Sequence, residues 1–288
     1  MSAQAGGRPV AIVAGGGALP PLLASAAVEA GREPVVFAIA TEADPAAFAP
    51  LRPHVLRWGE IGRMLQLAEA AGCSEAVLIG SVKRRPDFRA LRPDLATLTL
   101  LPRILQLLRH GDDGLLSGVA GLFKEQGIEL VSPLDIAPAL AMPEGLLTGS
   151  VSSDAMAEVG KAVEAARLIG RLDIGQGAVA VQGRVVAVED AGGTQDMLKR
   201  VAALRAAGRI GKSGGVLVKC MKPHQDSRLD LPTIGPVTAA EALAAGLDGV
   251  AAEAGRSLLA GRSETVAAFQ SAGLFLFGFA VPDTAREH

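Results

Sequence analysis

The segment Val10-Ala-Ile-Val-Ala-Gly-Gly-Gly-Ala-Leu-Pro-Pro21 decides the fold of the N-terminal half. Its first four residues, Val10–Val13, form an apolar run typical of a buried strand. A glycine triplet follows, and the two prolines suit the first turn of a helix, where the missing N–H is not needed. A strand, a glycine turn and a helix in this order are typical of an α/β protein.

The same alternation continues along the first half of the chain. We predict helices over residues 61–71 and between residues 95 and 126, and strands at Pro34–Ile39, Val55–Trp58, Ala76–Ile79 and Ile128–Val131. Alternating strands and helices favour a parallel sheet with helices on its faces. We therefore assign residues 1–132 to one domain of this kind.

Residues 133–149 contain three prolines and two glycines and show little periodicity, so we interpret them as a linker. Residues 150–288 then form a second α/β domain. It begins with a helix over residues 153–169, capped by Ser152 or Ser153. The turn Gln182-Gly183 predicts a β-hairpin. The remaining predicted elements are strands at 215–218, 250–252 and 274–279 and helices at 195–207, 238–245 and 263–272.

The composition excludes several classes of protein. The chain has 288 residues, a formal net charge of −2, no Tyr and one Trp. These values argue against a general nucleic-acid binder and against a base-stacking platform. No apolar run reaches the roughly 20 residues that span a bilayer, and the N-terminus does not resemble a signal peptide. Cys73 and Cys220 lack metal-ligand spacing, so we expect buried thiols.

The glycine triplet Gly15–Gly17 can let a backbone approach a phosphate or a ribose. A dinucleotide fingerprint would need a third glycine where Pro20 stands. It would also need an acidic residue at the end of the second strand, where the chain reads Ile39-Ala40-Thr41. The sequence therefore argues against a nicotinamide cofactor, while nucleotide contact and a simple tight turn both stay open.

The segment from Lys222 to Gly235 carries the densest charge in the second half. If it is extended, one face carries Lys222, His224, Asp226, Arg228 and Asp230. Paired carboxylates suit Mg²⁺, and basic side chains beside them suit phosphate oxygens. Gln225 would point the other way unless the chain bends near Pro223. The alternative is a solvated edge with i, i+2 ion pairs worth about 0–1 kcal/mol each.

Two further patterns have two interpretations each. The basic residues between Lys83 and Arg92, followed by the apolar stretch 95–108, suit an anionic membrane surface or an ordinary loop and core helix. Glu189, Thr194 and Asp196 suit a phosphate-and-metal site at a sheet edge. Thr194 also suits a helix N-cap, which we prefer on local sequence alone.

Four motifs together resemble the LpxI-type UDP-2,3-diacylglucosamine pyrophosphatases of lipid A synthesis, and the resemblance extends from about residue 10 to about residue 280. They are Ala14-Gly-Gly-Gly-Ala-Leu-Pro20, Arg85-Pro-Asp-Phe88, Ile169-Gly-Arg-Leu-Asp-Ile-Gly-Gln-Gly-Ala-Val179 and Lys222-Pro-x-Gln-x-x-Arg-x-Asp-Leu-Pro-Thr-Ile-Gly235. The resemblance implies an N-terminal Rossmann-like parallel sheet and a C-terminal mixed sheet, in two α/β domains joined by a linker.

The resemblance also implies an activity. A cytoplasmic Mg²⁺-dependent hydrolase, peripheral to the inner membrane, would convert UDP-2,3-diacylglucosamine to 2,3-diacylglucosamine 1-phosphate (lipid X) and UMP. No nucleic acid is implied, and a homodimer is left open. The family's essential aspartate falls on Asp230, whereas His224 matches no fixed position. Metal binding is expected at Asp230 and, less strictly, at Asp226.

The remaining expected site residues divide into two groups. The expected catalytic group is Asp230, Lys222, Arg228 and Gln225. The expected substrate-binding group is Gly16, Gly17, Ala18, Gly80, Ser81, Leu101, Pro102, Gln176 and Thr194. Two other classes compete with this interpretation. The first half alone favours a nucleotide-sugar oxidoreductase or epimerase, and the apolar stretch 95–108 favours a non-catalytic lipid-binding protein.

Overall fold

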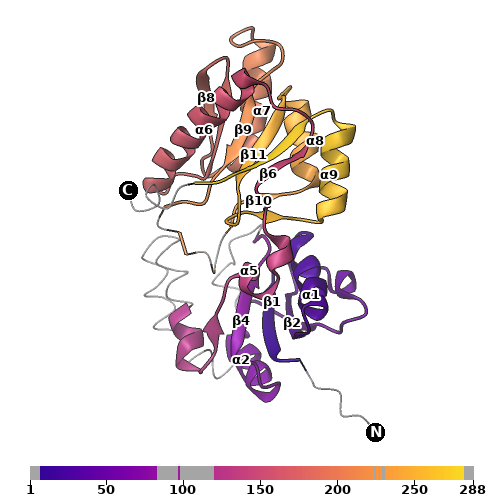
Figure 1. Cartoon of the computed structure of the whole chain (residues 1–288). Helices are drawn as coiled ribbons and strands as arrows, with labels where there is room; N and C mark the ends of the chain where they lie inside the picture. The colour runs from indigo at the N-terminus through magenta and orange to yellow at the C-terminus, as the bar shows by residue number, and fades with distance from the viewer. Residues whose placement is uncertain are drawn as a thin grey trace. The chain divides into compact units, whose positions relative to one another are not determined.

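The computed structural model of the chain describes residues 7–82, 97, 120–223, 225, 226, 228 and 231–281. The chain divides into two compact units, one comprising Met1–Ala139 with Asp226–Asp230 and the other Leu140–Gln225 with Leu231–His288 (Figure 1). The first unit contains a parallel sheet and the second a mixed sheet, which confirms the predicted fold class. Among the described residues, no helix is both long and apolar enough to cross a membrane.

The first unit is a five-stranded sheet in the order β3-β2-β1-β4-β5, and its neighbouring strands all pair in parallel. The strands are β1 (Pro9–Ala14), β2 (Glu33–Ile39), β3 (His54–Leu56), β4 (Glu75–Ile79) and β5 (Glu129–Leu130). The helical segments within the described residues are α1 (Leu19–Glu29), η1 (Pro45–Phe48), α2 (Ile61–Ala70), α5 (Pro133–Ile136) and η2 (Pro138–Leu140). The predicted strands and the helix at 61–71 are thereby confirmed, with ends shifted by up to two residues.

Helix α1 begins where the sequence predicts. Pro20 and Pro21 lie in its first turn, where neither residue needs an N–H. Helix α1 contacts β1 and β2. The buried side chains of α2 pack with Ala11 and Phe37 of the sheet in one apolar cluster. The sheet therefore has the layered α/β arrangement that the alternating sequence indicates.

The strand order places a topological switch point between β1 and β4. From β1 the chain moves outward through β2 and β3, and it then returns to β4 on the other side of β1. In doubly wound sheets, ligands bind outside the carboxyl ends of the two strands at such a point. Here those ends are followed by Gly15 and Gly80.

The second unit is a six-stranded sheet in the order β6-β13-β11-β9-β7-β8. Strands β13, β11 and β9 are parallel, whereas β6, β7 and the edge pair β7–β8 add antiparallel neighbours. The strands are β6 (Gly145–Thr148), β7 (Gly177–Val181), β8 (Arg184–Val188), β9 (Val216–Lys219), β11 (Gly249–Glu253) and β13 (Phe275–Phe279). The helices are α6 (Ser153–Arg171), α7 (Gly193–Ala206), α8 (Pro236–Ala244) and α9 (Arg262–Ser271).

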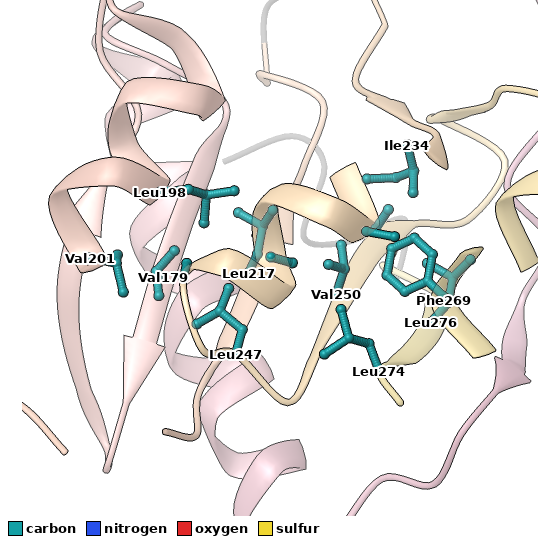
Figure 2. Packing of buried hydrophobic residues seen from close by; sticks show 14 of the residues in the cluster. Val179, Leu198, Val201, Leu217, Ile234, Leu247, Val250, Phe269, Leu274 and Leu276 are labelled. Carbon is teal, nitrogen blue, oxygen red and sulfur yellow. The ribbon is translucent and has the colours of Figure 1, made fainter. Parts of the chain in front are cut away.

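Both faces of this sheet are covered by apolar helices. Helix α6 packs its alanines and Val159 on one face, against alternate residues of β7 and β9. Helices α7, α8 and α9 cover the other face, where Leu217 and Phe269 are fully buried (Figure 2). Because successive strand side chains point to opposite faces, each central strand is buried on both sides.

Two local predictions in this unit are confirmed. Ser152 is the N-cap of α6, and its hydroxyl accepts a hydrogen bond from the N–H of Ala155. Gln182 and Gly183 have φ angles of 50° and 72°, so both central residues of the hairpin turn adopt the left-handed conformation that such two-residue turns require.

The segment predicted to be a linker is structured. Ser132 caps α5 in a capping box with Asp135, so Pro133 occupies a first helical turn instead of interrupting a loop. Strand β6 lies within the same segment and pairs with β13. The short strands β10 (Thr233–Ile234) and β12 (Leu258–Leu259), which pair in parallel, were also not expected, because two-residue strands carry almost no periodic signal.

Candidate functional site

The glycine triplet is anchored at the switch point of the first sheet. The N–H of Gly15 donates to the carbonyl of Ile79 at 2.8 Å, and Gly16 and Ser81 exchange backbone hydrogen bonds of 2.8 and 2.9 Å. These bonds bring Gly16, Gly80 and Ser81 together from two strands. The structure therefore groups five of the predicted substrate-binding residues, since Gly17 and Ala18 follow Gly16 directly.

The glycines here have distinct physical roles. Gly80 has a φ of +101°, and a Cβ on it would lie 2.7 Å from Pro20 Cγ and 2.8 Å from the carbonyl oxygen of Gly16. Gly80 therefore permits close packing of the two loops. Gly17 has a φ of +96°, but a Cβ on it would meet nothing within 4 Å. Gly17 and Ala18 are exposed, so their backbone can be reached by a ligand.

Three residues that the sequence analysis missed lie at the same edge. The indole N–H of Trp58 donates to the hydroxyl of Thr41 at 3.1 Å, and a Cβ on Gly16 would lie 3.0 Å from the carbonyl oxygen of Glu42. They follow β2 and β3, whose carboxyl ends share this edge with β1. The parallel order of the strands predicts this position, because it places the carboxyl ends of β1, β2 and β3 at one edge.

In the second unit, the chain bends sharply after β9. The N–H of Gln225 donates to the carbonyl of Lys222, and the N–H of Lys222 donates to Gln225 Oε1, both at 3.1 Å. This turn is the predicted bend at Pro223. Lys222 Nζ also forms an ion pair with Asp173, a residue of the Ile169–Val179 motif that was not expected at the site.

Asp226 and Arg228 bind each other. Arg228 Nε donates to the two carboxylate oxygens at 2.8 and 3.0 Å, and Arg228 Nη2 donates to Oδ2 as well. The side-chain hydrogen bonds from Arg228 lower the pKa of Asp226 and raise the pKa of Arg228. This is an i, i+2 ion pair of the kind that the sequence allows as the alternative to a metal-and-phosphate site. A metal ion at Asp226 would have to compete with a bidentate guanidinium.

Gln176 and Glu189 lie near the same end of β9. The carbonyl of Gln176 accepts from the N–H of Cys220 at 2.9 Å, while the side-chain Oε1 of Gln176 is buried without a hydrogen-bond partner among the described residues. Glu189 Oε1 accepts from the hydroxyl of Thr194 at 2.7 Å. The prediction that Thr194 caps its helix is wrong, because α7 begins at Gly193 with Gly192 as N-cap. Thr194 lies inside the first turn, and its hydroxyl is directed to Glu189.

The two cysteines are free and buried, as the sequence predicts. Burial raises the pKa of Cys73 to about 11, and it also raises the pKa of Cys220. Both thiols stay protonated near neutral pH, so neither is suited to act as a nucleophile.

Several predicted residues cannot be compared with the structure. Asp230, Leu101, Pro102 and His224 lie outside the described residues, as do residues 83–96 and 98–108. Within the described part of the chain, no group of three His, Cys, Asp or Glu side chains is arranged to hold a metal. A free, buried carboxylate oxygen of Glu189 is nevertheless the kind of hard ligand that Mg²⁺ prefers.

Comparison with known proteins supports the same interpretation across both units. The family model for the LpxI N-terminal domain matches residues 9–140, and the model for the LpxI C-terminal domain matches residues 143–277. A curated relative from Caulobacter vibrioides, UDP-2,3-diacylglucosamine pyrophosphatase LpxI, is 43% identical over 275 residues. The similarity covers 94% of this chain and 97% of the relative.

Proposed function

The chain belongs to the LpxI family, and we therefore infer that it hydrolyses the pyrophosphate bond of UDP-2,3-diacylglucosamine in lipid A biosynthesis. The products are 2,3-diacylglucosamine 1-phosphate and UMP. The observation that carries this conclusion is the similarity to a named pyrophosphatase over nearly the full length of both chains. It favours a hydrolase over the oxidoreductase and lipid-binding alternatives.

The glycine edge of the first sheet supports a substrate-binding role. We propose that Gly16, Gly17, Ala18, Gly80 and Ser81 contact the nucleotide part of the substrate. Pro20 and Pro21 have no N–H, so the donors that α1 can offer a phosphate are confined to its first residues and the loop before it. The exposed backbone of Gly17 is the natural point of contact.

The charged segment that follows β9 supports the chemistry. We propose that Asp230 holds Mg²⁺ and that Lys222 and Arg228 stabilise negative charge on the diphosphate. When bound, Mg²⁺ supplies positive charge to the diphosphate and makes water a stronger nucleophile near neutral pH. Gln225 fixes the turn that presents Lys222, and Asp173 holds the Lys222 ammonium by an ion pair. Hydrogen bonding to Asp226 orients the guanidinium of Arg228.

Membrane contact is a further part of the proposal. The substrate carries two acyl chains, so the enzyme must meet it at a lipid surface, and we propose peripheral association with the cytoplasmic face of the inner membrane. Sedimentation with vesicles containing anionic lipid tests this, and protein that stays in the supernatant at low salt would contradict it. Self-association into a homodimer is tested by light scattering.

Product analysis tests the reaction. The purified protein, incubated with UDP-2,3-diacylglucosamine and Mg²⁺, is expected to release UMP and lipid X in equal amounts. Release of UDP instead of UMP would place the cleavage at the sugar–phosphate bond and contradict pyrophosphate hydrolysis. Retention of intact UDP-lipid without turnover would favour the lipid-binding alternative.

Replacing Gly17 by Ala is expected to raise KM by about tenfold with little change in kcat. The added methyl meets no protein atom but occupies the space through which a ligand reaches the backbone. Steady-state kinetics with UDP-2,3-diacylglucosamine measure the effect.

Gly72→Ala is the matched control, because Gly72 also has a positive φ, +73°, and open space around a new Cβ. Both variants carry left-handed backbone strain of about 1–2 kcal/mol, so their melting temperatures should fall by similar amounts. An equal KM in the two variants would remove Gly17 from the substrate site.

A further inference from the structure

Two buried charged residues flank a glycine at the carboxyl edge of the second sheet. Gly177 pairs with Lys219 of the neighbouring strand β9. On its other side, the carbonyl of Gly177 accepts from the N–H of Glu189 at 2.8 Å. Lys219 is 8% exposed and Glu189 is 7% exposed. These three residues therefore form a row across the strands, with Gly177 between Glu189 and Lys219. Because the middle residue is glycine, that position has no side chain.

The charged side chains of this row lie on the face covered by α7. Lys219 is two residues after Leu217, so both side chains point to the face where α7 packs. A Cβ on Gly177 would lie 2.8 Å from Glu189 Oε2 and 3.3 Å from the terminal methyl of Met197, a residue of α7. The carboxylate of Glu189 therefore lies over Gly177, next to the first turn of α7.

Neither charge is satisfied by the described part of the protein. Glu189 Oε1 accepts from Thr194, but Oε2 is buried without a partner. Among the described residues, Lys219 forms no hydrogen bond and no ion pair, and it does not reach within 4 Å of Glu189. A carboxylate oxygen that is buried without a hydrogen bond costs free energy. Glu189 Oε2 therefore serves stability poorly and suits an external ligand.

Two acidic residues close in sequence to Glu189 have basic partners. Asp190 binds Arg200 at 3.0 Å, and Asp196 binds Lys199 at 3.0 Å. Within the described part of the chain, the ammonium of Lys219 and Glu189 Oε2 have no partner, and together they suit a ligand that combines negative charge with a hydrogen-bond donor. A phosphate joined to a sugar has both.

We propose that Lys219 and Glu189 form a sugar-phosphate subsite over Gly177. The Lys219 ammonium binds a phosphate oxygen, and Glu189 Oε2 accepts a hydrogen bond from a hydroxyl of the attached sugar. This proposal rests on the proposed function, because UDP-2,3-diacylglucosamine carries a diphosphate between two sugars. Thr194 is a positioning residue that fixes the orientation of the Glu189 carboxylate.

The experiment measures the Kd of UDP-2,3-diacylglucosamine in mixed micelles with EDTA present, and the KM for UMP release with Mg²⁺. The variants are Lys219→Met, Glu189→Gln and Gly177→Ala. Gly177 does not have a positive φ, so alanine fits the backbone and fills the space beneath the carboxylate. We expect Kd and KM to rise about tenfold for Lys219→Met and Gly177→Ala and about threefold for Glu189→Gln.

Matched controls come from α6. Lys161→Met removes an exposed positive charge, and Gly160→Ala adds a methyl that meets nothing within 4 Å. Both controls should keep Kd and KM within about twofold of the wild-type values. Thermal melting separates a ligand role from a structural one. Lys219→Met should melt at the same or a higher temperature, because the ammonium forms no hydrogen bond or ion pair with a described residue that the substitution would remove.

The outcomes distinguish the two proposals. If the wild-type protein releases UMP but Lys219→Met binds and turns over substrate normally, the subsite is wrong and the proposed function stands. A lower melting temperature for Lys219→Met with normal binding would assign Lys219 a structural role and also overturn the subsite. If the wild-type protein releases no UMP, the proposed function itself fails.

Discussion

Chelation of divalent cations with EDTA is expected to suppress UMP release from UDP-2,3-diacylglucosamine by at least about 10³-fold. The diphosphate carries charge that Lys222 and Arg228 can neutralise only in part, because each of these side chains already has a carboxylate partner. In the proposed mechanism, the metal ion supplies the rest of the positive charge. Product analysis with and without EDTA, followed by back-titration with Mg²⁺, measures the effect.

Two controls make the metal prediction specific. Circular dichroism melting in EDTA should match melting in Mg²⁺, because both cores of the second unit are built from apolar contacts that need no ion. Activity should return on addition of Mg²⁺ and should not return with Na⁺ at equal ionic strength. Full activity in EDTA would contradict a metal-dependent mechanism.

Replacing Asp230 by Asn is expected to lower kcat by about 10³-fold or more, with a smaller change in KM. Asparagine keeps the size and one oxygen of the side chain but removes the charge that we propose binds Mg²⁺. Kinetics at saturating substrate measure the loss. The affinity for Mn²⁺, followed by its electron paramagnetic resonance signal, gives a readout that does not depend on turnover.

Asp226→Asn is the matched variant for this test. Both oxygens of Asp226 accept hydrogen bonds from Arg228, so this carboxylate is already occupied. We expect Asp226→Asn to lower kcat by about tenfold or less, through looser orientation of Arg228. It should leave the affinity for Mn²⁺ within about threefold of the wild-type value.

The comparison of the two variants assigns the metal ligand. Equal losses of kcat and of Mn²⁺ affinity would mean that both carboxylates bind the ion and that the Asp226–Arg228 pair opens when metal arrives. A larger loss at Asp226 than at Asp230 would reverse the assignment. Asp154→Asn, a change on the exposed first turn of α6, controls for the loss of one surface charge.

The sequence predicted the structure best where the conformation of a short segment depends on that segment's own residues. The run Val10–Val13, the glycine triplet and the two prolines predict a strand, a turn and a helix, and all three are confirmed. Gln182-Gly183 predicts a hairpin in the same way, because its φ angles depend on those two residues alone. Residues 133–149, which we interpret as a linker, contain α5 and β6, because the cap at Ser132 places Pro133 in a first helical turn.

The sequence by itself determined the α/β class, the glycine turn after β1 and the density of charge after Lys222, because each depends on residues that are neighbours in the chain. The tertiary structure determined which of these residues lie close together in space. Strand order brought Ser81 to Gly16 across 65 residues, and hairpin register brought Glu189 to Gly177. The tertiary structure also gave Lys222 its partner Asp173, whereas Lys219 has no ion-pair partner within the described part of the chain. Spacing along the chain cannot predict such encounters, because they depend on pairing between strands that are distant in sequence.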